Sequence, residues 1–299
     1  MYMPRKKLPL KNLLTITKNT FRQWIKADPF RQSAVVAYYA VFSIPALLVI
    51  VIAVAGLVFG EEAVRGEISD QIQRALGRDT AESVESIIVK ASEEKTSVIA
   101  TIIGVLTLIV GSTGVFSELQ TSLNHIWQVQ VVAKKKWLKT IKTRLFSFGL
   151  VLSLAFLMLV SLLLTAGLEA FSELIRDRFP DFVPFLLRVA GFLLSFGVIT
   201  VLFALIFKIL PDAKIRLRDV WIGAMVTTLL FILGKFLLGI YFAKANPGST
   251  YGAAGSIVLI MLWVSYSCMI LFFGAEFTKQ YAVFHGHEIQ PKPQARLVE

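Results

Sequence analysis

One lysine interrupts an apolar stretch of the chain, and its position makes it the first candidate for chemistry. Lys235 is the only charged residue in 220–243. It follows Asp219 by sixteen residues, which is about 24 Å along a helix. An ionisable group at that depth in a membrane is costly and is by default a functional candidate. Its amine could reach the outer headgroups, pair with Glu169 or Glu173, or face an anionic ligand.

Hydroxyl groups beside a proline form the second group of candidates. Pro45 lies in the middle of the first apolar run, where proline removes a backbone hydrogen bond and bends a helix. A broken helix often lines a transport cavity, although proline also bends purely structural spans. With Lys235, the substrate-binding candidates are Tyr38, Tyr39, Ser43, Tyr241, Ser249 and Tyr251, and Pro45 is the candidate hinge.

Two carboxylates lie near the carboxyl ends of apolar helices. The helix dipole disfavours negative charge at Glu118 and Glu276. Each therefore needs a partner, most simply a Lys or Arg from a neighbouring basic loop. Structural ion pairing, a gate and a proton-linked carboxylate all stay open as interpretations. The gate or ion-pair candidates are Glu118, Glu276, Asn124 and Glu169.

Sequence patterns typical of enzymes are missing. The three histidines, His125, His285 and His287, have no HExxH or Cys/His ligand spacing around them. The single cysteine, Cys268, has no partner for an intrachain disulfide. Neither a Gly-x-Ser-x-Gly elbow nor a Walker phosphate loop occurs. We therefore expect a protein that is not an enzyme, with no catalytic residue, metal or cofactor.

Helices that cross a membrane must position these candidates. Of the 299 residues, 56% are hydrophobic and only 17% are charged, whereas soluble domains are about 25% charged. Six long runs carry at most one charge each, and about 20 apolar residues suffice to cross a bilayer. The sequence predicts an all-α transmembrane bundle of about six spans. The expected spans are 33–59, 96–117, 145–168, 187–207, 219–243 and 252–275.

The segments outside the spans are predicted to form interfacial helices and a tail. Residues 1–31 place apolar side chains opposite Lys and Arg, which is typical of a helix in the headgroup layer. The outer segment 61–95 carries two amphipathic stretches that would form a lid or a cover for apolar surface. We expect a cytoplasmic arm at 1–31, a transmembrane domain at 32–284 and a mobile cytoplasmic tail at 285–299.

Basic residues predict the orientation. The segments 1–31, 118–144, 208–219 and 276–299 together hold 21 Lys and Arg against seven acids. The positive-inside rule places these segments and both termini in the cytoplasm. The net charge of +11 then reflects topology and attraction to anionic headgroups on that side. We expect membrane lipids as partners and no nucleic acid, and a homo-oligomer stays open.

Several motifs, in order along residues 20–284, resemble the YihY/BrkB family of bacterial membrane proteins. They include AYYAVFSIPALLV at 37–49, GSTGVFSELQTSLNHIW at 111–127, LPDAKIRLRDVWIGA at 210–224 and LFFGAEFT at 271–278, with a further long match at 234–267. The resemblance implies a multi-pass protein of the bacterial plasma (inner) membrane. Older labels for the family are virulence factor and ribonuclease BN, and transport has been suggested. The residues give the ribonuclease label no chemical support.

Two functions from different classes fit these patterns. The first is a transporter-like or lipid-handling protein for an anionic or amphiphilic solute, which predicts a cavity that reaches Lys235. The alternative is a non-transporting membrane scaffold or envelope-assembly factor, which predicts a closed bundle with an exposed apolar patch. The lack of an ion or nucleotide motif favours the alternative, whereas a cation embedded beside tyrosines favours the first.

Overall fold

The computed structural model describes residues 10–76, 81–82, 84–86, 89, 98–132, 182–245, 247, 254–293 and 295–298. The predicted span at 145–168 lies outside these residues. The helices are α1 (Leu10–Lys26), α2 (Pro29–Phe59), α3 (Glu61–Leu76), α5 (Val98–Ile126), α7 (Phe182–Ile209), α8 (Leu217–Ala245) and α9 (Gly255–Phe284). The strands are β1 (Val129–Val131), β2 (Ala213–Lys214), β3 (Gln290–Pro291) and β4 (Ala295–Leu297).

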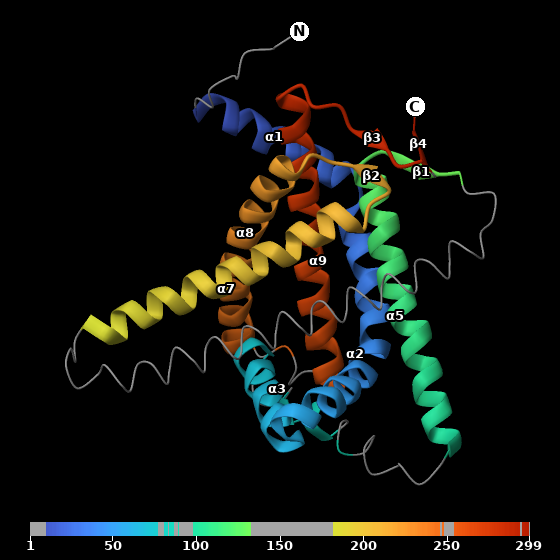
Figure 1. The fold of residues 1–299 in the computed structure, drawn as a ribbon, viewed down its shortest axis with the longest axis vertical. Helices are drawn as coiled ribbons and strands as arrows, with labels where there is room; N and C mark the ends of the chain where they lie inside the picture. Colours follow the sequence, from blue (N-terminus) through green and yellow to red (C-terminus); the bar gives the residue numbers. More distant parts are fainter. Residues whose placement is uncertain are drawn as a thin grey trace.

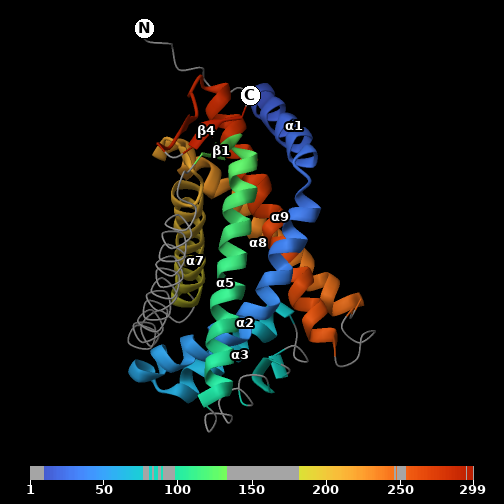
Figure 2. The same ribbon diagram turned by 90° about the vertical axis from the view of Figure 1, so that its right-hand side faces the viewer.

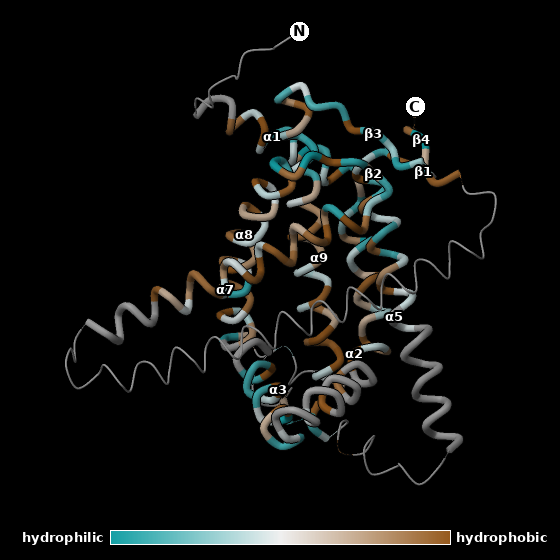
Figure 3. Tube along the Cα trace, viewed as in Figure 1, coloured by the Kyte–Doolittle hydropathy of each residue, from teal (hydrophilic) through white to brown (hydrophobic). Residues whose placement is uncertain are grey.

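Three of the described helices are long and apolar enough to cross a membrane. The stretches that meet this condition are Val189–Ile209, Leu217–Phe242 and Gly255–Phe284. Large apolar side chains such as Leu229, Leu233 and Phe236 lie exposed on the outside of α8, as expected where lipid replaces water around a helix. Figure 3 shows hydrophilic residues gathered toward the two ends of the molecule, with hydrophobic ones between them. The predicted class, a helical membrane protein, is therefore confirmed.

The helix α9 runs through the middle of the described bundle and packs against α2, α8 and α1 (Figures 1 and 2). The helix α5 lies along α2, and α7 packs on α8. The main core lies where these helices converge, and Leu123, Trp127, Phe207 and Phe272 are almost fully buried in it. The helix α2 passes through Pro45 without a break in its helical range, but the Pro45 side chain lies outside the described residues, so its role as a hinge stays a prediction.

Two glycine–threonine pairs let α8 and α9 approach closely. Gly223 of α8 faces Thr278 of α9, and Gly274 of α9 faces Thr227 of α8. Each threonine hydroxyl donates to a carbonyl of its own helix, at 2.7 Å from Thr227 to Gly223 and at 2.7 Å from Thr278 to Gly274. Small residues at a helix contact allow such packing in membranes. We call these four residues the α8–α9 lock.

The described segments outside the long helices occupy opposite ends of the molecule (Figures 1 and 2). The helix α1 and the four strands lie at one end, which we call the α1 end, and α3 lies at the other. The apolar face predicted for the outer segment is present, because Val64, Ile68 and Ile72 of α3 pack near Ile52 of α2. The α3 helix therefore covers apolar surface of the bundle.

The tail that the sequence predicts to be mobile instead forms β3 and β4. Strand β4 pairs antiparallel with β1, opposing Arg296 to Gln130, and β3 pairs antiparallel with β2. The His287 Nδ1 atom lies 2.8 Å from a carboxylate oxygen of Asp219, which is 1% exposed. Backbone groups at the edges of β1 and β2 supply the pairing. The polar composition of the tail gives no sign of these partners.

Candidate functional site

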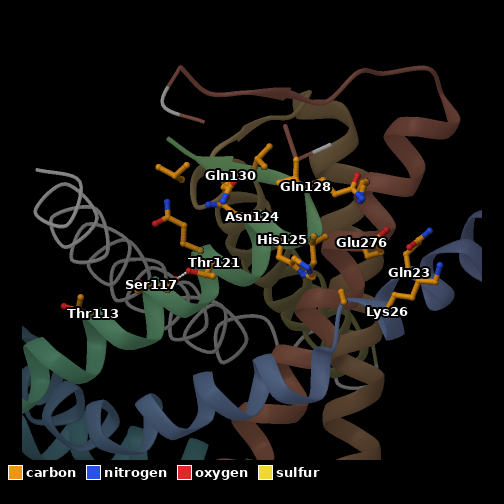
Figure 4. A pocket seen from close by; sticks show the side chains of 17 residues that line it. Gln23, Lys26, Thr113, Ser117, Thr121, Asn124, His125, Gln128, Gln130 and Glu276 are labelled. Atoms are coloured by element: carbon orange, nitrogen blue, oxygen red, sulfur yellow. Dashed lines mark hydrogen bonds between the residues drawn. The ribbon is translucent and has the colours of Figure 1, made fainter. Parts of the chain in front are cut away.

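A cavity of about 820 Å³ lies at the α1 end, where α1, α5, α9 and the β1–β4 strand pair meet (Figure 4). Polar side chains predominate among the described residues that line it. Five are amides that donate and accept hydrogen bonds, namely Gln23, Gln120, Asn124, Gln128 and Gln130. An uncharged polar wall of this kind suits a ligand with several oxygen atoms.

One face of α5 extends the polar wall along the helix. Thr113, Ser117, Gln120 and Asn124 recur at intervals of three or four residues, which places them on one side of an α-helix. The eleven residue steps from Thr113 to Asn124 correspond to about 16 Å along the axis. The sequence predicts a span at 96–117, which includes Thr113 and Ser117, and polar side chains in such a helix are normally directed at protein or at a water-filled cavity. We call Thr113, Ser117, Gln120 and Asn124 the α5 stripe; it extends polar groups from the α1 end toward the middle of the helix.

Charge gathers at the α1–α9 side of the cavity. In Figure 4, Glu276 lies on the same side as Gln23 and Lys26, whereas Thr113 and Ser117 lie on the other side, with His125 between. The Glu276 side chain comes from α9 and is 2% exposed. Its Oε1 atom accepts a hydrogen bond of 2.7 Å from Gln280 Nε2. Lys279, one helical turn further along α9, also lines the cavity.

The Asn124 side chain holds the wall of the cavity in place. Its Nδ2 donates to Asp212 Oδ2 at 2.9 Å, and its Oδ1 accepts from the Asp212 backbone N–H at 2.7 Å. Gln120 Nε2 donates to the carbonyl of Leu210 at 3.1 Å. Asn124 and Asp212 are both buried, at 8% and 3% exposed. These bonds fix the carboxyl end of α5 to the connection between α7 and α8.

Two of the gate or ion-pair candidates, Glu276 and Asn124, meet at this cavity. Glu118 is half-buried on α5 and is not among the described lining residues. Glu169 lies outside the described residues. Lys26, Lys279 and the four glutamines that line the cavity were not among the predicted site residues. For Gln120, the available signal was the three-and-four spacing of polar residues after Gly111, which continues past the apolar part of α5.

The described substrate-binding candidates do not line this cavity. Lys235 is exposed on α8 and is not a described lining residue of the cavity. Tyr38 and Tyr241 are 55% and 48% exposed. Tyr39 and Ser43 lie at the contact between α2 and α5, where they pack against Gly114 and Gly111. Ser249 and Tyr251 lie outside the described residues.

The apolar helices and the polar cavity at one end define an integral membrane protein. The family model described as "Virulence factor BrkB" matches residues 20–297, and the chain belongs to this family. It is 30% identical over 194 residues to a "UPF0761 membrane protein" of Tolumonas auensis, covering 64% of this chain and 60% of the relative. It is also 30% identical over 206 residues to a "UPF0761 membrane protein" of Alcanivorax borkumensis, covering 66% and 44%. The chain thus spans less than two thirds of these relatives, and no solved structure matches it.

Proposed function

We propose that this chain is a transporter-like or lipid-handling protein that takes an anionic or amphiphilic solute into the cavity at the α1 end. The observation that carries the proposal is the α5 stripe, which lines a cavity of about 820 Å³. Lys26 and Lys279 supply positive charge beside it. Lysine ammonium groups bind phosphate and carboxylate as point charges. The proposed site is therefore at α1, α5 and α9 rather than at Lys235.

The proposed setting is the bacterial inner membrane, crossed six times, with both termini in the cytoplasm. The common location of α1 and the tail strands at one end, opposite α3, supports this orientation (Figure 2). The helix α1 buries Ile16 and Thr20 while it exposes Leu13, Leu14 and Phe21. An exposed apolar side next to basic residues suits a helix in the inner headgroup layer.

Cysteine labelling tests this orientation. Cys268 is buried and is the only cysteine of the chain, so a Cys268→Ala background gives little labelling of its own. In that background, we expect Glu62→Cys in α3 to react with a membrane-impermeant maleimide in intact spheroplasts. We expect Lys18→Cys in α1 to react only after the membrane is permeabilised. The opposite pattern would contradict the proposed orientation.

Reconstitution tests the proposed movement of a solute. Vesicles with the purified protein and a tail-labelled fluorescent phosphatidylglycerol are treated with dithionite, which bleaches only the outer leaflet. We expect the protein to raise the bleached fraction above that of protein-free vesicles. Vesicles loaded with glycerol phosphate test a soluble solute in the same way, by its release.

Charge-removing variants link the movement to the cavity. The double variant Lys26→Gln, Lys279→Gln should slow the movement about tenfold or more, because each charge-assisted contact contributes about 1.5–3 kcal/mol. Lys18→Gln is the matched control, since Lys18 is exposed on α1 and is not a described lining residue. Vesicles in which neither solute moves would contradict the proposal and favour the scaffold function.

A further inference from the structure

Glu276 is the single acid among the described residues that line the cavity. It stands there with two lysines, Lys26 and Lys279, and its side chain is 2% exposed. Burial of a carboxylate is costly unless a positive charge and hydrogen bonds compensate for it. The partners of this one acid therefore indicate which ligand the cavity accepts.

The protein itself compensates Glu276 only in part. Gln280 donates to Oε1 at 2.7 Å, while none of the hydrogen bonds found for the described residues ends on Oε2. In the described part of the chain, no Lys or Arg nitrogen lies within 4.0 Å of this carboxylate. Lys279 interacts with it electrostatically from further away. One oxygen of a buried carboxylate is thus left to a hydrogen-bond donor in the cavity.

We infer that the cavity selects a zwitterionic ligand, a phosphate ester that carries a primary ammonium group. This inference rests on the proposed function and deepens it. The ammonium group would donate to Glu276, and the phosphate would accept from Lys26 and Lys279. The amides and hydroxyls along α5 would bind the remaining oxygen atoms. Figure 4 places Glu276 and Lys26 on the same side of the cavity, where the two charges of one small headgroup can reach both.

Charge complementarity favours a zwitterion over the simpler ligands. A ligand with only negative charge would bring its anion next to the Glu276 carboxylate, and like charges repel. A ligand with only positive charge would meet Lys26 and Lys279. A zwitterion gives every one of these three side chains a partner of opposite charge.

Binding of matched headgroups to the full-length protein in detergent tests the inference. Native mass spectrometry compares phosphatidylethanolamine with phosphatidylglycerol of the same acyl chains. We expect the wild-type protein to bind the ethanolamine lipid about tenfold more tightly, as one charge-assisted contact would give. Phosphatidylcholine, whose ammonium group has no N–H to donate, should bind more weakly than phosphatidylethanolamine. Soluble phosphoethanolamine and glycerol phosphate form a second arm, which shows whether the headgroup alone suffices.

The variant Glu276→Gln removes the charge and nearly preserves the size of the side chain. We expect it to lose the preference for the ethanolamine lipid while its affinity for phosphatidylglycerol stays the same or rises. Glu276→Asp should keep the preference, and Glu288→Gln, at an exposed acid of the tail, should leave it unchanged. Lys279→Gln should weaken the binding of both lipids.

Three outcomes separate the two proposals. Equal wild-type binding of phosphatidylethanolamine and phosphatidylglycerol would overturn the inference and leave the proposed function standing. A preference that persists in Glu276→Gln would also overturn it. Wild-type protein that binds none of these lipids or soluble phosphates would count against the inference and the proposed function together. If Glu276→Gln does not fold, the wild-type protein still tests the inference: phosphatidylcholine bound as tightly as phosphatidylethanolamine would overturn it.

Discussion

Gly223→Ala and Gly274→Ala are each expected to lower the thermal midpoint of the purified protein markedly. A Cβ atom at either position would collide with the hydroxyl oxygen of the facing threonine, Thr278 or Thr227. Those threonines cannot simply turn away, because their hydroxyls are bonded to carbonyls of their own helices and both side chains are fully buried. Overpacking of this kind typically costs about 1–3 kcal/mol. Fluorescence-detected size-exclusion after heating measures the midpoint.

Glycines elsewhere in α7 and α8 provide matched controls. A Cβ at Gly197 of α7 or Gly239 of α8 would meet nothing within 4 Å. Alanine favours a helix over glycine by about 1 kcal/mol, so Gly197→Ala and Gly239→Ala should leave the midpoint unchanged or raise it. Adding Thr278→Ala to Gly223→Ala should restore part of the loss, because the colliding hydroxyl is gone. If all four glycine variants had the same thermal midpoint, the α8–α9 lock would not account for the stability of the contact between α8 and α9.

The second large effect is expected from Asn124→Asp. The new carboxylate at position 124 would face the carboxylate of Asp212, replacing a donor of a 2.9 Å hydrogen bond with a negative charge. Both positions are buried, so the repulsion is weakly screened. We expect a loss of folded protein in detergent extracts, in line with the several kcal/mol that broken buried polar networks cost. The yield of the monodisperse peak measures it.

A reciprocal exchange serves as the control for this pair. The double variant Asn124→Asp, Asp212→Asn restores one donor facing one acceptor, so the yield should recover in part. Thr121→Ala removes a neighbouring polar group that is exposed and whose one hydrogen bond among the described residues goes to its own helix, at 2.8 Å to the Ser117 carbonyl. That variant should be near neutral. A double variant no better than Asn124→Asp alone would mean that this pair does not fix α5 to the α7–α8 connection.

Much of the helical architecture could be predicted from apolar runs and the residues that end them. The first predicted span and α2 both end at Phe59, where Gly60 has a φ of 86° that favours glycine. The α9 helix continues nine residues beyond the predicted boundary at 275. The prediction stopped at Glu276 because a charge normally marks the end of a span. Here the last turns of α9 pack against α1, where protein replaces lipid as the surrounding medium.

The candidate site was harder to predict, because the direction of a side chain depends on packing. The depth of Lys235 followed from simple counting. Its direction did not, because α8 has apolar residues on all sides, with Ala224 buried and Leu229 exposed. Such a helix gives no pattern that separates an inner from an outer face. The cavity could not be predicted from the sequence either, because its walls come from four distant segments of the chain that only the fold brings together.

The pairing of β1 with β4 has a consequence for biosynthesis. Gln130 and Arg296, which oppose each other in this pair, are 166 residues apart. A ribosome that adds about 5–20 residues per second needs roughly 10–30 s to cover that distance. Throughout this interval the nascent chain carries β1 with an open edge, which is a template for pairing with another polypeptide. Newly made copies therefore pass through a period of vulnerability that ends only when translation reaches the final strand.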